Sequence, residues 1–337
     1  MSTSLLKALP FDEILGQERA LAILANALER DRVSHAYLFV GPEGVGRETT
    51  ALSFFWRLLC EKGRACGECK PCLKFLRGVH PDFYVLKPAG KSIKIEQIRT
   101  LEAKLHLHPV EGKHRLVLLP AAETLTREAA NALLKSLEEP PLHTVFVLIA
   151  QTSEALLPTI VSRCQLLRFR PLSTSQVETL LVSRFERDPE EARGLALLCE
   201  GSIGRALRLS EKGLLEELHR FVAAVSSGSP TQIVAVAEVF EALKEKEDLP
   251  LFIELVLLWL RQGLLSHVGL GEYPSIFPSR PPKSFIVPAC GEVEKAFAAL
   301  EANLHVELFF LKLLSTLAAL WREAERAEVS PVGARAA

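Results

Sequence analysis

The first 170 residues alternate between strand-like and helix-like segments, and this alternation constrains the fold more than any other feature. Five apolar runs have the length of a strand, and they cover residues 36–41, 82–87, 114–120, 144–150 and 164–170. Segments with helical periodicity lie between them, such as the one that begins near Thr126 and stops at Pro140. Strands that alternate with helices favour a mostly parallel sheet covered on both faces, so the sequence predicts an α/β fold here.

The remainder of the chain is almost entirely helical in pattern. A break near residue 171 and another near Gly213 divide it, and the helices after Gly213 are long and rich in Leu and Ala. A single core stops growing at roughly 250 to 300 residues, and the chain has 337. We therefore expect three parts, which are residues 1–170, 171–212 and 213–337.

A glycine-rich loop follows the first predicted strand. Its three glycines are Gly41, Gly44 and Gly46. A glycine-rich loop between a strand and a helix is typical of the phosphate-binding motif GxxxxGK[ST]. Here Arg47 stands at the position of the Lys, and Glu48 stands at the position of the hydroxyl residue that holds magnesium. A planar guanidinium is a poor substitute for a compact ammonium. A carboxylate beside phosphate costs on the order of 4 kcal/mol per charge pair at roughly 4 Å and an effective dielectric of about 20.

The acidic half of a hydrolytic site is altered as well. ATP hydrolysis needs carboxylates at the end of a later strand, where they hold the metal and orient the attacking water. The corresponding run ends in Pro120 and Ala121, and the first carboxylate after it is Glu123. The sequence thus predicts that ATP is not bound or not hydrolysed. Two alternatives stay open. The loop could be a glycine-rich turn that has no nucleotide-binding function, or the chain could be a divergent ATPase that tolerates Arg47 and uses Glu123 as its carboxylate.

Four cysteines lie within residues 60–72. They are Cys60, Cys66, Cys69 and Cys72. Two overlapping CxxC elements can bring four thiolates around one tetrahedral zinc ion, and a closed shell of this kind leaves no open position for catalysis, so we expect structural zinc. An odd total of seven cysteines fits a reducing compartment better than disulfides. A redox dithiol stays open as an alternative.

Composition argues against a broad polyanion-binding surface. The net charge is −1 and 24% of the residues are charged, so any contact with nucleic acid is expected to be local. This disfavours the alternative of a zinc-dependent DNA-binding module. The N-terminus lacks the pattern of an export signal, and the longest apolar stretch carries Glu254 and Arg261, short of the roughly 20 apolar residues that a membrane span needs. We expect a cytoplasmic protein with no membrane segment.

Several stretches together resemble a known family. In chain order they are FDEILGQERALAILANAL, SHAYLFVGPEGVGR, the four-cysteine insert, HPDFYVL, IKIEQIRTL, EAANALLKSLEEPP and IVSRC. Over residues 11–212 the chain is similar to the AAA+ clamp-loader family of bacterial DNA polymerase III. The resemblance implies an α/β AAA+ nucleotide-fold domain with a parallel sheet, a small helical lid, and an all-α collar that joins a ring of five subunits.

Within that family, the altered loop resembles the members that do not hydrolyse ATP. The resemblance implies gamma/tau ATPase and delta subunits as partners in a hetero-pentameric ring. It also implies that the sliding clamp and primer-template DNA are reached through the complex, which loads the clamp onto primed DNA. The chain would then be part of the DNA polymerase III holoenzyme without an ATPase of its own.

Two arginines stand at motifs of this family. Ser162, Arg163 and Cys164 fall on its SRC motif, which implies that Arg163 is a finger inserted in trans at the ATP of a neighbouring subunit. The local sequence alone fits an arginine that balances a helix dipole. The lid motif GSxRDA reads GSIGRA here, so Gly204 occupies the position of the sensing arginine and Arg205 is displaced by one residue, about 100° on a helix.

Overall fold

The computed structural model describes residues 8–105, 108–242, 248–271, 273–274, 277–299 and 306–329. The first seven residues, on which part of the expectation about export depends, lie outside this range. The chain divides into two compact units. The first comprises Met1–Gln176 with Gly201–Gly204, and the second comprises Val177–Glu200 with Arg205–Ala337. Each unit is described by itself, and the division into three parts remains a prediction.

A parallel five-stranded sheet forms the centre of the first unit, in the order β2-β3-β4-β1-β5. The strands are β1 (Ala36–Val40), β2 (Phe83–Val85), β3 (Arg115–Leu119), β4 (Thr144–Ala150) and β5 (Gln165–Arg168). Every residue of β1, β3 and β4 is buried, as expected when helices cover both faces of a parallel sheet. The prediction of a parallel α/β sheet is confirmed.

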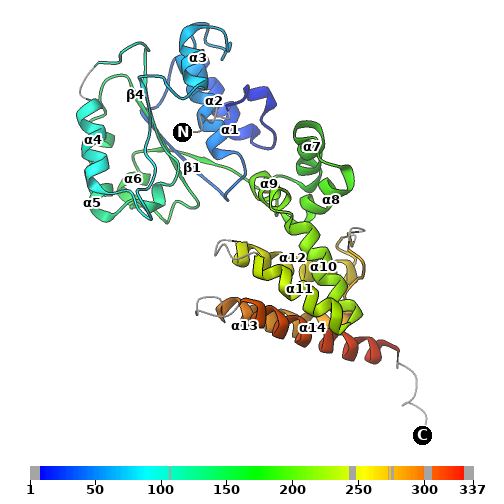
Figure 1. Cartoon of the computed structure of the whole chain (residues 1–337). Helices are drawn as coiled ribbons and strands as arrows, with labels where there is room; N and C mark the ends of the chain where they lie inside the picture. The colour runs from blue at the N-terminus through cyan, green and yellow to red at the C-terminus, as the bar shows by residue number, and fades with distance from the viewer. Residues whose placement is uncertain are drawn as a thin grey trace. The chain divides into compact units, whose positions relative to one another are not determined.

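Helices cover the two faces of this sheet (Figure 1). They are α1 (Glu18–Glu29), α2 (Arg47–Leu59), α3 (Lys70–Leu76), α4 (Ile95–Leu105), α5 (Arg127–Glu138) and α6 (Pro158–Val161), with short 3-10 turns at Phe11–Glu13 and Ala122–Thr124. Alternate residues of β1 serve opposite faces: Tyr37 packs with Phe54 of α2 at a ring distance of 5.3 Å, whereas Leu38 packs with Leu133 of α5. The ends of β1 and β4 therefore lie between two packed layers.

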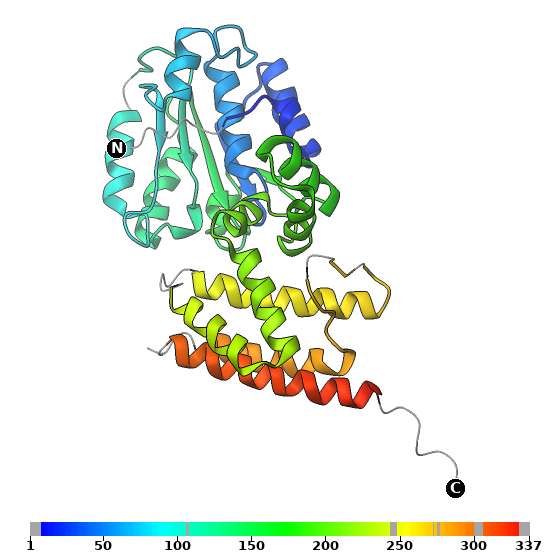
Figure 2. The ribbon, with the colours of Figure 1, turned by 45° about the vertical axis from the view of Figure 1, so that its right-hand side comes forward.

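The second unit is helical. Its helices are α7 (Thr174–Phe185, which begins in the first unit), α8 (Pro189–Leu198), α9 (Ile203–Glu211, likewise), α10 (Leu214–Ser227), α11 (Pro230–Ala242), α12 (Asp248–His267), α13 (Lys283–Ala299) and α14 (Val306–Val329). Helix α14 packs against α10, α11 and α13, and α13 packs against α12 (Figure 2). Trp259 and Trp321 stack in the core at 6.3 Å with an interplanar angle of 6°. The predicted run of helices after the α/β part is confirmed.

Helix α12 accounts for the most apolar stretch of the sequence. Within the described part of the chain, its residues Leu249–His267 are long and apolar enough to cross a membrane by length and composition alone. Phe252, Leu255 and Trp259 of this helix are fully buried, and Phe252 packs edge-to-face on Phe221 of α10. Such burial is typical of a core helix in a bundle.

Candidate functional site

The loop between β1 and α2 has the backbone of a glycine-rich turn. Gly44 and Gly46 adopt φ values of 76° and 99°, in the left-handed region that favours glycine. Gly41 needs to be small for a different reason, since a Cβ there would lie 2.5 Å from the carbonyl oxygen of Phe169. Helix α2 begins directly after the loop at Arg47. In phosphate loops this arrangement turns backbone N–H groups toward the anion.

A distant segment of the same unit lies directly on this loop. The backbone N–H of Gly204 donates to the carbonyl oxygen of Gly44 at 3.1 Å. A Cβ on Gly204 would lie 2.9 Å from the Cα of Gly44, and a Cβ on Gly44 would lie 2.2 Å from the Oγ of Ser202. The two backbones touch with no side chain between them. An arginine at position 204 would not fit without moving one of them.

Arg47 is bound inside the protein. Its side chain is buried, and Nη1 donates to the carbonyl oxygen of Ala150 at the end of β4 at 2.5 Å. Burial lowers the pKa of Arg47, while Glu123, Glu43 and Glu48 act in the opposite direction. The guanidinium thus ties the start of α2 to β4. In a working loop a lysine at this position reaches the outer phosphates instead.

The two carboxylates considered at the sequence level lie in different surroundings. Glu48 is exposed on the first turn of α2. Glu123 lies in the turn after β3, and its Oε2 is buried with no hydrogen-bond partner among the described residues. Glu123 is also the carboxylate with the strongest electrostatic effect on Arg47. The charge that faces Glu123 from the loop is therefore a guanidinium.

Gln17 is a polar residue of this site that the sequence analysis did not single out. It is buried at the start of α1, where its Nε2 donates to the carbonyl oxygens of Val45 at 3.2 Å and of Arg170 at 2.8 Å. Its Oε1 accepts the backbone N–H of Arg170 at 3.1 Å. One amide therefore ties the loop to the end of β5. The only sequence signal was a glutamine beside Gly16 at the beginning of an amphipathic helix.

Arg163 lies just past α6, at the surface of the first unit. Its Nη1 donates to the carbonyl oxygen of Thr159 at 2.9 Å and to the Oγ of Ser162 at 3.3 Å. Its Nη2 forms an ion pair of 2.7 Å with Oε1 of Glu138, the last residue of α5. The side chain is 33% exposed. The bond to Thr159 is the helix-end contact of the simpler interpretation, and the exposure leaves the guanidinium accessible from outside.

The four cysteines of the insert converge. Their sulfur atoms all lie within 4.8 Å of one another, and those of Cys66 and Cys72 are 3.9 Å apart. Four sulfurs at about 2.3 Å from one tetrahedral ion would lie roughly 3.8 Å apart, so the cluster fits such an ion. Backbone N–H groups of Cys66 and Cys69 point to the sulfurs of Cys60 and Cys66 at 3.4 and 3.5 Å. Burial raises the pKa of Cys60, but N–H donors outweigh it and bring this pKa to about 6.

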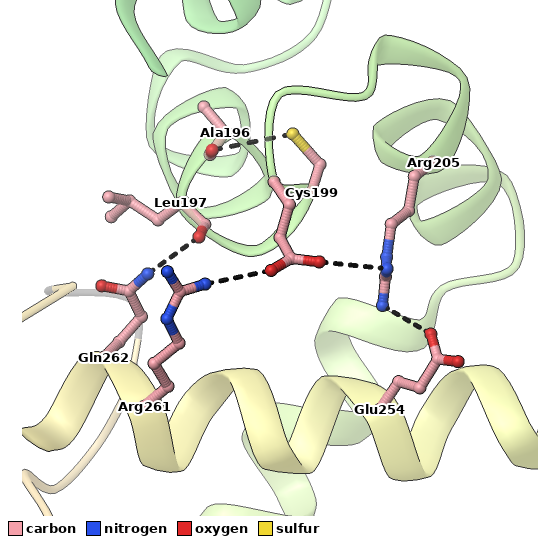
Figure 3. Close-up of polar contacts among 8 residues, drawn as sticks. Ala196, Leu197, Cys199, Arg205, Glu254, Arg261 and Gln262 are labelled. Atoms are coloured by element: carbon pink, nitrogen blue, oxygen red, sulfur yellow. Dashed lines mark hydrogen bonds and ion pairs between the residues drawn. The ribbon is translucent and has the colours of Figure 1, made fainter. Parts of the chain in front are cut away.

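Arg205, the displaced arginine of the lid motif, binds carboxylates within the second unit (Figure 3). Its Nη2 donates to Oε2 of Glu254 on α12 at 2.8 Å, and its Nη1 lies 3.6 Å from Oε2 of Glu200. Arg261 of α12 pairs with the other oxygen of Glu200 at 3.0 Å. Next to it, Gln262 donates to the carbonyl oxygen of Leu197 at 3.0 Å. The sequence analysis noted the displacement of Arg205 but not these partners.

The fold and the loop define the class of protein. A parallel sheet in the order β2-β3-β4-β1-β5, with a glycine loop between β1 and α2 and helices following the sheet, is the nucleotide fold of AAA+ proteins, here with an altered phosphate loop. Residues 16–173 match the model of the family described as DNA polymerase III, delta subunit.

The particular relatives are delta-prime subunits. The chain is 39% identical over 196 residues to the DNA polymerase III subunit delta′ of Bacillus subtilis, covering 58% of this chain and 59% of the relative. It is also 39% identical over 212 residues to that of Pseudomonas aeruginosa, covering 61% and 65%. The chain thus matches about three fifths of the length of these relatives. The resemblance to delta-prime subunits is confirmed.

Other similar proteins are more distant. The tau subunit of DNA polymerase III from Escherichia coli is 35% identical over 212 residues, which cover 60% of this chain and 33% of that protein. A solved structure of a gamma subunit-related protein from Thermotoga maritima has a TM-score of 0.45 at 20% identity, with 89% of this chain and 99% of that one covered.

Proposed function

We propose that the chain is a delta-prime-type subunit of the DNA polymerase III clamp loader that does not hydrolyse ATP itself. It supports ATP-driven loading of the sliding clamp onto primed DNA, in the cytoplasm. Its partners in this proposal are gamma/tau ATPase and delta subunits in a hetero-pentameric ring, and it meets the clamp and primer-template DNA through that ring. The match to two delta-prime relatives at 39% identity supports the assignment.

The buried bond between Arg47 and Ala150 is the observation that carries the absence of hydrolysis. The carbonyl oxygen of Gly44 is bonded to Gly204, and the only cation of the loop, Arg47, is bonded to Ala150. A phosphate at the loop would meet a cation that is already bonded elsewhere, and it would gain neither a lysine nor a hydroxyl ligand for magnesium. The loop in this proposal is a structural part of the subunit.

Arg163 is proposed as the catalytic contribution of the chain, delivered in trans. Phosphoryl transfer spreads negative charge over the transferred group, and an arginine placed there stabilises the transition state. The exposure of its guanidinium and its place at a surface turn support this role. The chain itself supplies no nucleophile, and its neighbour holds the ATP.

We also propose that Cys60, Cys66, Cys69 and Cys72 hold one structural zinc ion. The mutual sulfur distances within 4.8 Å and the N–H groups directed at two of the sulfurs support this. Zinc bound there would cross-link the insert to α3, whose first residues follow Cys69. Zinc in a closed thiolate shell supplies no catalysis.

A nucleotide assay on the purified chain tests the central claim. We expect no saturable binding of radiolabelled ATP and no turnover, with a competent gamma/tau subunit as the positive control. The Arg47→Lys variant should be equally inactive, because Glu48 and Pro120 remain. Turnover by either chain would instead favour the divergent ATPase, and salt-dependent DNA binding by the chain alone would favour the DNA-binding module.

A further inference from the structure

Glu138 is the acidic partner of Arg163, and the proposed function gives this carboxylate no role of its own. It is the last residue of α5, which packs against α6 (Figure 1). A carboxylate at the C-terminal end of a helix faces the negative end of the helix dipole, which is unfavourable unless a cation offsets it. Arg163 is that cation, at 2.7 Å. The position of the Glu138 carboxylate therefore depends on Arg163, and the position of the Arg163 guanidinium depends on Glu138.

The ion pair fixes the direction of the guanidinium. Three acceptors hold it, and they come from two helices: Glu138 from α5, and Thr159 with Ser162 from the end of α6. Without Glu138, the remaining two acceptors lie on the residues immediately before Arg163. A side chain bound only by its own turn can rotate about that turn, whereas a bond to a second helix limits the rotation.

The contacts do not use up the donors of Arg163. A guanidinium has five N–H groups in a planar fork, and the bonds to Glu138, Thr159 and Ser162 involve only Nη1 and Nη2. Among the described residues, no partner is found for Nε. The side chains of Arg163 and Glu138 are 33% and 48% exposed. The arginine can therefore stay on Glu138 and still donate to an anion from outside.

We propose that Glu138 is a positioning residue for Arg163, which holds the guanidinium in the orientation that the phosphate of a neighbouring subunit meets. This inference depends on the proposed function, because it gives Arg163 its target. Orientation of a group before the reaction lowers the barrier only if the group acts in the transition state. Loss of Glu138 is therefore expected to lower kcat and to leave the KM for ATP unchanged.

The test compares four chains in the reconstituted clamp-loader complex: the unchanged chain, Arg163→Ala, Glu138→Gln and the double variant. The measurement is clamp- and DNA-stimulated ATPase as a function of ATP concentration. Arg163→Ala defines the share of kcat that depends on the finger. Glu138→Gln should reduce that share about fivefold, the size of a good exposed ion pair, and should add nothing in the Arg163→Ala background.

Glu139→Gln is the matched control, because Glu139 is the next residue, is exposed, and has no side-chain partner among the described residues. An unchanged rate with Arg163→Ala overturns the proposed function. A clear loss with Arg163→Ala but none with Glu138→Gln overturns only the inference about Glu138. A further loss from Glu138→Gln in the double variant, or an equal loss from Glu139→Gln, also overturns it, because Glu138 would then act independently of Arg163.

Discussion

The loop after β1 holds Arg47 of the altered phosphate loop, and the turn after α6 holds Arg163 of the SRC motif. The two arginines differ in how far they are buried and in what they are bonded to. At the loop, the cation is 8% exposed and bonded to a backbone carbonyl, and the loop backbone is paired with Gly204. At the turn, the cation is 33% exposed and its partner Glu138 is 48% exposed. Arg47 at the loop is held by a buried bond, whereas Arg163 at the turn is held by contacts that water already reaches.

Under the proposed function, this difference would explain how a subunit can lose one half of an active site and keep the other. Buried hydrogen bonds are costly to break because their groups would be left unpaired. Exposed ion pairs contribute about 0 to 1 kcal/mol, and the pair with Glu138 leaves N–H groups of Arg163 able to donate to another anion. A loop closed in the first way serves as structure, while an arginine held in the second way remains able to serve a partner.

The largest expected effect concerns Arg163, the exposed arginine of this comparison. Replacing Arg163 with Ala should abolish the contribution of one ATP site, because arginine fingers are worth roughly 10³ to 10⁵ in rate at the site they serve. The clamp-stimulated ATPase of the reconstituted complex should fall in part, and clamp loading should fall further if the sites act together. Folding and zinc content should not change, and Arg168→Ala, at an exposed position of the edge strand β5, is the control.

The cysteine cluster tests whether a third region of the unit depends on metal for its order. We expect one zinc per chain by elemental analysis. Cys69→Ser should lower the zinc content and the melting temperature, because the free energy of metal binding is coupled to local folding. Cys164→Ser, at a cysteine outside the cluster, should leave the zinc content unchanged. Full occupancy in Cys69→Ser would refute the site.

A smaller effect is expected at the loop after β1, where the backbone of Gly44 contacts that of Gly204. Gly204→Ala places a Cβ 2.9 Å from the Cα of Gly44, so one backbone segment must move. Crowding of this kind costs about 1 to 3 kcal/mol, and denaturant unfolding should show it. Gly291→Ala is the control, because a Cβ there meets nothing within 4 Å inside helix α13. An unchanged or raised stability for Gly204→Ala would mean that the loop is not closed by this contact.

The smallest expected effect concerns Arg205, the arginine displaced from the lid motif. Its bond to Glu254 joins α9 to α12 within the second unit, and Arg205 is 18% exposed in its side chain. Glu254→Gln should lower the free energy of unfolding by about 1 kcal/mol or less, since the pair is partly exposed. Arg205→Ala and the double variant complete a cycle that isolates the pair. A coupling energy of zero would show that the network in Figure 3 does not stabilise the unit.

Periodicity predicted the sheet well because apolar runs are local signals. The runs 82–87 and 164–170 contain β2 (Phe83–Val85) and β5 (Gln165–Arg168), each observed shorter than the run. Thr126 was expected as a helix cap, and its side chain does accept the backbone N–H of Ala129. The excess residues lie outside the strands and include the charged Asp82, Lys87 and Arg170, because periodicity does not fix the residue at which a strand ends.

The contacts that decide the site were beyond the reach of the sequence. Gly44 and Gly204 are 160 positions apart, and the sequence around either glycine gives no signal that the two are in contact. The same holds for Gln17 with Arg170, and for Glu138 with Arg163. The identity of each residue could be noted from a motif, but its partner depends on how the strands and helices are packed. The convergence of four cysteines was predictable because their spacing is short.

The pairing of Gly44 with Gly204 also has an evolutionary consequence. A loop that had lost only its lysine could return to hydrolysis by one substitution. Here a return would need changes at Arg47, Glu48 and Gly204, and also at the end of β3, where Pro120 stands. The change at Gly204 by itself pushes on the backbone of Gly44. Residues in contact do not mutate independently, so the single steps are harmful although their combination need not be. Under the proposed function, a return to hydrolysis would therefore depend on several coupled substitutions and not on one.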